Sequence, residues 1–203
     1  MAPMAGIISE FIEAVLSSLL DPNPVGFRAS DERGVAPVRA ACRGRSETPQ
    51  RLQRPLNRNA FLRGVLDVTE QEAIEHLVIG FGKRLRSTTR VETIAHGVGS
   101  ARQVSIPAGL WNAMDQWLAG HARGEVVLAH SHPRNALNIL LDNVPLASGA
   151  DRDAWLRALL QGKRIRCYLV ENGFVREFRT PMLLRLLDRI TRKTQPAQEV
   201  GFA

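Results

Sequence analysis

Two histidines separated by one residue follow directly on a short apolar stretch. Residues 126–129 are Val, Val, Leu and Ala, a run with two β-branched side chains that predicts a buried strand. Side chains alternate between the two faces of a strand, so His130 and His132 project to the same side if the strand continues through them. Pro133 has no N–H for a strand ladder and should end the strand. Two imidazoles at the end of a buried strand suit a divalent metal, although the same pair is compatible with a solvated position or a cap on the core.

Two other stretches carry groups that could work with these histidines. Upstream, Glu75 and His76 stand immediately before the apolar residues 77–79. Downstream, Ser148 and Asp151 form a Ser-x-x-Asp sequence that opens a helical pattern. Glu, then His-x-His-Pro, then Ser-x-x-Asp, in this order, resembles the motif of the JAMM (MPN+/JAB) metalloproteases. The Glu-His dipeptide before one strand and the His-x-His-Pro at the end of another are most similar to the RadC-like bacterial branch of that family.

The resemblance implies an active site built from five residues. His130, His132 and Asp151 would hold Zn²⁺, and Glu75 would be the general base. The Ser148 hydroxyl would donate to the oxyanion of the tetrahedral intermediate, in addition to capping its helix. The expected activity is hydrolysis of an amide or isopeptide bond, with a peptide or a ubiquitin-like protein as substrate.

The chain departs from the family pattern between the second histidine and the serine. Fifteen residues separate His132 from Ser148, more than in the usual motif. The added segment would form a loop or short helix over the site. Alternatively, Asp142 is the metal carboxylate, although it has no serine three residues before it. We prefer Asp151, and a degraded site that binds no metal is the third alternative.

The elements that must position these residues follow from hydrophobic periodicity and turn signals. The fold class is α/β, and the resemblance implies the mixed sheet of the MPN fold, flanked by helices. Thr69 and Glu72 form a capping box for a short helix at 70–75. His96 is expected in a solvated turn, and His76 is expected to point away from the site. The predicted strands are 76–82, 90–96, 102–106, 126–131, 164–170 and 174–179, and the predicted helices are 107–121, 149–161 and 181–193.

The chain is predicted to have four parts. Residues 1–24 contain an amphipathic helix, which packs on the domain, on a second copy in a homodimer, or on a partner. Residues 25–60 are rich in Arg, Pro, Gly and Ser and have little periodicity, which predicts a mobile, basic linker. The JAB/MPN-like domain would occupy residues 61–195, followed by a tail at 196–203. The linker is either a solvated connection or an arm that binds the phosphates of a nucleic acid.

Composition bounds the class of protein. The 203 residues are 44% hydrophobic and 23% charged, as in a globular protein. The two cysteines, Cys42 and Cys167, are far apart and form no metal-binding spacing, which excludes a disulfide framework and fits the reducing cytoplasm. The first basic residue is Arg28 and no apolar run is long enough for a membrane span, so we expect neither a signal peptide nor a membrane partner. The net charge of +7 admits a second hypothesis, a RadC-like accessory protein that binds nucleic acid through the basic linker and has no active metal site.

Overall fold

The structure is a computed structural model that describes six stretches of the chain. They are residues 23–70, 74–86, 88–99, 106–131, 164–171 and 173–178. The helices predicted at 149–161 and 181–193, the helix within 1–24 and the tail at 196–203 lie outside the described residues. The strand predicted at 102–106 also lies outside them, except for Ile106, which is not in a strand.

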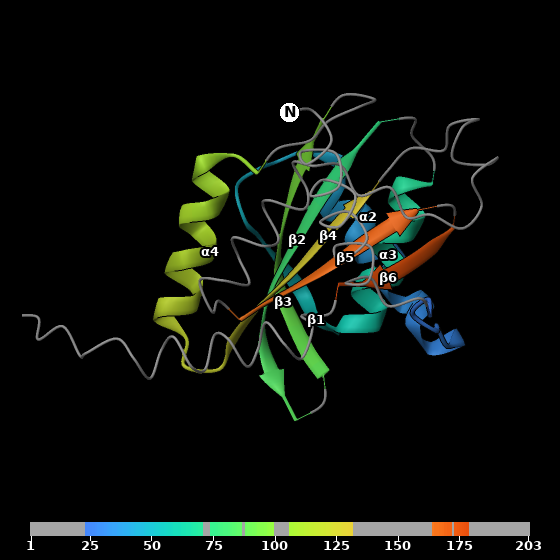
Figure 1. Ribbon diagram of the computed structural model, residues 1–203, viewed down its shortest axis with the longest axis horizontal. Helices are drawn as coiled ribbons and strands as arrows, with labels where there is room; N and C mark the ends of the chain where they lie inside the picture. The colour runs from blue at the N-terminus through green and yellow to red at the C-terminus, as the bar shows by residue number, and fades with distance from the viewer. Residues whose placement is uncertain are drawn as a thin grey trace, which may run out of the picture.

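A six-stranded mixed sheet forms the centre of the described fold (Figure 1). Its strands lie in the order β1-β3-β2-β4-β5-β6. All neighbouring pairs are antiparallel except β4 and β5, which run parallel. The predicted α/β class with a mixed sheet flanked by helices is therefore confirmed. The bounds are β1 Gln50–Asn57, β2 His76–Leu85, β3 Thr88–Val98, β4 Gly124–Ser131, β5 Ile165–Glu171 and β6 Phe174–Glu177.

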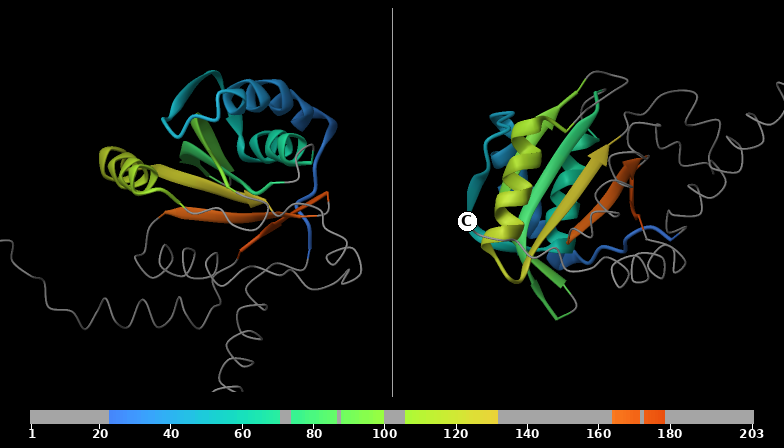
Figure 2. Two further views of the ribbon diagram at one scale, coloured as in Figure 1. Left: turned by 90° about the horizontal axis from the view of Figure 1, so that it is seen from above. Right: turned by 60° about the vertical axis from the view of Figure 1, so that its left-hand side comes forward.

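Helices cover both faces of this sheet. The 3₁₀-helix η1 (Ala29–Gly34), α2 (Val35–Arg43) and α3 (Arg58–Thr69) belong to one side, and α4 (Ala108–Gly120) covers the other. The right-hand view of Figure 2 shows α4 in front of the strands and α3 behind them. Within the described ranges, none of the helices has the length and apolar character needed to cross a membrane.

The alternation of side chains along β2 separates the core into two clusters. Leu77, Ile79 and Phe81 pack on the side of α4, whereas Val78 packs on the side of α3. Every residue of β4 is buried, because both of its faces are covered. The Val- and Leu-rich sequence at 126–128 is thus that of a strand with no solvent-facing side, as the apolar run predicts.

The prediction of a mobile linker at 25–60 is wrong, because most of this segment is folded against the sheet. It contains η1, α2, β1 and the start of α3, and several of its apolar residues are buried in the core, among them Val38, Leu52 and Leu56. Its arginines also find partners across the fold. Arg39 makes a bidentate pair with Asp67 of α3, with N–O distances of 2.7–3.1 Å. The composition of the segment suggested disorder, but the apolar residues that it buries pack it against the sheet.

A second correction concerns the capping box that Thr69 was predicted to form. Thr69 is the last residue of α3, and its hydroxyl donates to the carbonyl of Leu66 within the final turn. The helix begins twelve residues earlier, where the Asn57 side chain accepts a hydrogen bond from the Ala60 amide at 2.7 Å. Glu72, the other half of the predicted box, lies outside the described residues.

The close packing of α2 against α3 gives a stability test. A Cβ at Gly64 would lie 2.5 Å from the Gly34 carbonyl oxygen and 2.6 Å from the Val38 Cβ. Gly64→Ala should therefore lower the free energy of unfolding in urea by about 1–3 kcal/mol. The matched control is Gly109→Ala in α4, where no atom lies within 4 Å of the added methyl group, and there stability should rise by up to about 1 kcal/mol. Equal effects of the two changes would contradict the packing of α2 on α3.

Candidate functional site

The strand register brings Glu75 and His130 together at one end of the sheet. Glu75 directly precedes β2, and His130 is the penultimate residue of the antiparallel strand β4, where it pairs with Leu77. The distance from the Glu75 Oε2 to the His130 Nε2 is 3.3 Å. Both residues are buried, with exposed fractions of 6% for Glu75 and 2% for His130. Two residues predicted from separate motifs, 55 positions apart in the chain, thus form one contact.

The backbone around Glu75 is held on two sides. The amide of the next residue, His76, donates to the Ser131 hydroxyl oxygen at 2.9 Å, which joins the start of β2 to the end of β4. The Glu75 carbonyl accepts from the Gly99 amide at 2.9 Å, which joins it to the end of β3. These bonds fix the position from which the Glu75 carboxylate reaches the imidazole. Ser131, which stands between the two histidines in the sequence, therefore has a positioning role.

A pair of buried histidines lies on the opposite face of the sheet from His130. His76 and His96 stack with their rings 5.2 Å apart, and their exposed fractions are 0% and 2%. The His96 Nδ1 lies 3.0 Å from the Cys42 carbonyl, to which it must donate. In neutral His96 the Nε2 is then the acceptor, and the His76 Nδ1, 3.0 Å away, donates to it.

This pair corrects the predicted position of His96. His96 is expected in a solvated turn from the sequence, whereas β3 continues to Val98 and buries it. The sequence could have indicated this burial, because His96 follows the buried Ile94 by two residues and strand side chains two apart share a face. His76 does point away from the site, as expected. Its role is to connect β2, through His96, to the end of α2.

The other predicted site residues lie outside the described residues. These are His132, Ser148 and Asp151, together with the alternative ligand Asp142. Among the residues that the structure describes, no group of three or more His, Cys, Asp or Glu side chains could hold a metal ion. The described part of the site therefore consists of one imidazole and one carboxylate.

No family model, curated protein or solved structure matches this chain. The chemistry of the site must therefore be argued from its own side chains. An imidazole is a common zinc ligand, and a buried carboxylate beside it can accept and return a proton. Glu75 and His130 can thus supply part of a metal site and its base.

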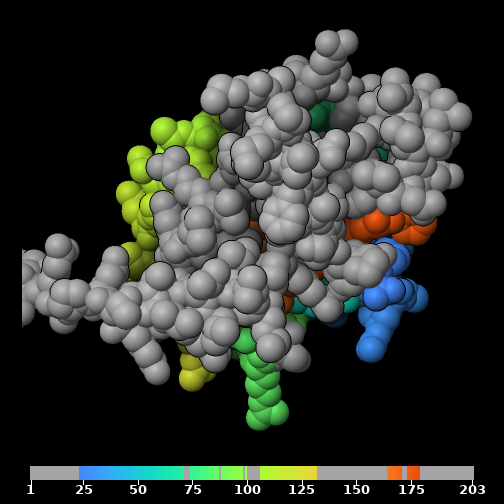
Figure 3. Space-filling model, viewed as in Figure 1, coloured from blue at the N-terminus to red at the C-terminus, as the bar shows by residue number. Residues whose placement is uncertain are grey.

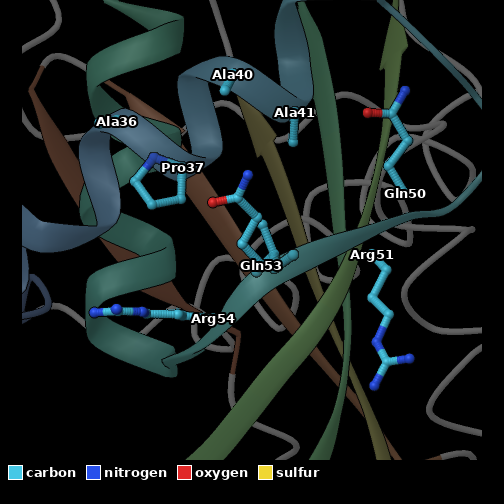
Figure 4. A pocket seen from close by; sticks show the side chains of 9 residues that line it. Ala36, Pro37, Ala40, Ala41, Gln50, Arg51, Gln53 and Arg54 are labelled. Atoms are coloured by element: carbon cyan, nitrogen blue, oxygen red, sulfur yellow. The ribbon is translucent and has the colours of Figure 1, made fainter.

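The cavity between α2 and β1 offers no comparable chemistry (Figure 4). It has a volume of about 480 Å³, and neither carboxylates nor imidazoles line it. Its walls are small α2 residues on one side and glutamine and arginine residues of β1 on the other. This cavity is therefore separate from the candidate site.

Neither cysteine is a nucleophile at neutral pH. Burial raises the pKa of the Cys42 thiol to about 12, and burial with a smaller effect of Glu177 raises the pKa of Cys167 to about 12. The ordinary value is 9.0, so the thiolate fraction at neutral pH falls by roughly three orders of magnitude.

A thiol reagent should leave the native protein unlabelled at pH 8 and label both cysteines in guanidinium chloride. Rapid labelling of the native protein would contradict the burial of these side chains.

Proposed function

We propose that this protein is a zinc-dependent hydrolase of the JAMM type, built on an MPN-like fold, that cleaves peptide or isopeptide bonds. The observation that carries the proposal is the buried contact between Glu75 and His130 at 3.3 Å. Burial of a carboxylate costs free energy unless the group has a specific partner, so packing alone does not explain this contact. The order of the motifs in the chain supports the same assignment.

The donor chemistry of the described residues fits a zinc site. His130 supplies a neutral nitrogen, and His132 and Asp151 would complete a set of two imidazoles and one carboxylate, which leaves a fourth position for water. Zinc, when bound, lowers the pKa of that water towards neutrality and polarises the scissile carbonyl. The preference for Asp151 over Asp142 as the third ligand belongs to this proposal.

Each remaining residue has a role at a stated atom. The Glu75 carboxylate accepts a proton from the attacking water and returns it to the leaving amine, so that the C–N bond breaks to give an acid and an amine. Two hydrogen bonds hold the backbone that carries this carboxylate: the His76 amide donates to the Ser131 hydroxyl, and the Gly99 amide donates to the Glu75 carbonyl. The Ser148 hydroxyl would donate to the oxyanion that forms on the substrate.

The substrate class and the compartment follow from the same proposal. A site that hydrolyses amide bonds requires a peptide or the tail of a ubiquitin-like protein. The two free, buried cysteines are those of a protein in a reducing environment, so we place the protein in the cytoplasm. The helix predicted within residues 1–24 is a candidate for contact with a second copy.

Metal content tests the ligand set. Protein purified without chelators should carry about one zinc per chain, and the metal should be lost in His130→Ala, His132→Ala and Asp151→Ala. Asp142→Ala should keep it. His121→Ala, which removes a half-buried histidine at the end of α4, is the control and should also keep it. A metal-free wild type would contradict the proposal, and loss of metal in Asp142→Ala alone would move the third ligand to Asp142.

The role of Glu75 is tested separately from metal binding. Glu75→Gln keeps the size and the hydrogen-bonding ability of the side chain but cannot accept a proton at neutral pH. Zinc content should be unchanged, and hydrolysis of an isopeptide-linked ubiquitin-like dimer or a peptide library should fall about 10²–10⁴-fold. The change should be in kcat rather than KM. Full activity in this variant would remove Glu75 from the mechanism.

A further inference from the structure

Four arginines line an open groove at the other end of the strands that carry the candidate site. The groove lies between the β2–β3 turn and the α4–β4 turn and has a volume of about 960 Å³. In Figure 3 these two turns stand side by side at the lower edge of the molecule, in green and yellow. The Arg84 amide donates to the Arg123 carbonyl at 2.8 Å, which joins the turns directly. The lining residues are Arg84, Leu85, Arg86, Thr88, Ala122, Arg123 and Arg164.

Among the residues that the structure describes, no acidic side chain lines this groove to balance its positive charge. Two acidic side chains on the adjoining strands are already engaged: Glu92 pairs with Lys83 at 3.6 Å, and buried Glu125 binds Arg166 at 3.0 Å. Among the described residues, Arg84, Arg86 and Arg123 have no ion pair with a carboxylate. Their exposed guanidinium groups therefore keep their hydrogen-bond donors for a ligand.

The groove is built from fixed parts. The Arg164 guanidinium donates to the carbonyls of Leu118 at 2.8 Å, His121 at 3.2 Å and Ala122, so it caps the end of α4 and holds its charge in one place. Arg86 occupies a left-handed backbone conformation with φ of 44°. Glycine or asparagine would adopt this conformation at lower energy. An arginine here keeps a guanidinium at the tip of the hairpin at the expense of some backbone strain.

We propose that this arginine groove binds the phosphate backbone of double-stranded nucleic acid. Guanidinium groups match phosphate oxygens in a bidentate arrangement. The three exposed arginines Arg84, Arg86 and Arg123, beside the fixed charge of Arg164, suit several phosphates rather than a single ion. No aromatic side chain lines the groove, so unpaired bases would find no surface on which to stack. A projecting two-stranded hairpin is also of a size that the groove of a duplex admits. Binding should therefore be independent of sequence and should favour a duplex over a single strand.

This proposal does not depend on the hydrolase. The ten residues of β2 separate the groove from Glu75 by about 30 Å, so a ligand in one place leaves the other free. It also relocates the nucleic-acid contact expected from the sequence. An arm that binds phosphates was one of the two alternatives for residues 25–60, beside a solvated connection. That segment is largely folded, and Arg39 and Arg63 in and beside it pair with carboxylates. The two locations can be distinguished directly.

The test compares two pairs of exposed arginines in the full chain by fluorescence anisotropy with a labelled DNA duplex of mixed sequence. Arg86→Asn with Arg123→Gln removes two charges from the groove, and asparagine accepts the backbone conformation at position 86. Arg51→Gln with Arg54→Gln removes two charges from β1, where both arginines line the other cavity (Figure 4). The groove variant should bind about tenfold more weakly, and the slope of log affinity against log salt should fall by about 2. The β1 variant should change affinity less than about twofold.

Four outcomes would overturn the proposal. The first is no binding of the duplex by the wild type, and the second is an equal loss in the two variants. The third is binding of vesicles that contain phosphatidylserine, lost in the groove variant, without binding of the duplex, because the groove would then recognise a membrane surface. Circular dichroism melting curves should be the same for the wild type and both variants, since all four side chains are exposed. Tighter binding of a single strand than of the duplex would also contradict the assignment.

Discussion

The pairing of β2 with β4 is the constraint on which the rest of the structure depends. Both strands are covered on both faces, so the register between them is set by two cores at once. A slip of one residue would turn Leu77, Ile79 and Phe81 from the side of α4 to the side of α3. It would also move Glu75 away from His130, because their contact needs Leu77 opposite His130. The packing that stabilises the domain and the geometry of the candidate site therefore have the same physical cause.

The layer formed by α2 and α3 reinforces this pairing at the end where the site lies. The His96 ring donates to the Cys42 carbonyl in the last turn of α2 and accepts from His76, the residue after Glu75. A helix that contributes no candidate catalytic side chain thus helps to orient the carboxylate through a chain of two imidazoles. The segment before the predicted domain boundary is part of the folded unit for this reason, and its removal would leave His96 without its carbonyl partner.

The sequence predicted those features that depend on local patterns and missed those that depend on contacts distant in the chain. The apolar run at 126–129 and the turn signals further along the sequence were sufficient to place β4, β5 and β6 within a few residues. The order of the motif residues indicated that Glu75 and His130 come together, and the two side chains are in contact. Their roles in a site stay a prediction. The folding of residues 25–60 was missed because Arg39 is neutralised by Asp67, 28 positions away, and no local pattern shows this. His96 was expected in a turn because the predicted strand ended at residue 96, two residues before the end of β3. Its inward-facing position within the strand was therefore not recognised.

The two buried carboxylates of this sheet show why Glu75 and not Glu125 is the candidate for chemistry. Glu125, at the other end of β4, accepts from Thr89 and binds Arg166 at 3.0 Å, and Arg166 also reaches Glu177. A guanidinium remains protonated at any physiological pH and cannot bind a metal, so this network only compensates buried charge. Glu75 faces an imidazole, a group that in its neutral form has a lone pair for a metal. Glutamates buried to a similar extent at the two ends of this strand pair thus have different partners, an arginine at Glu125 and a histidine at Glu75, and the proposal of proton transfer concerns Glu75 alone.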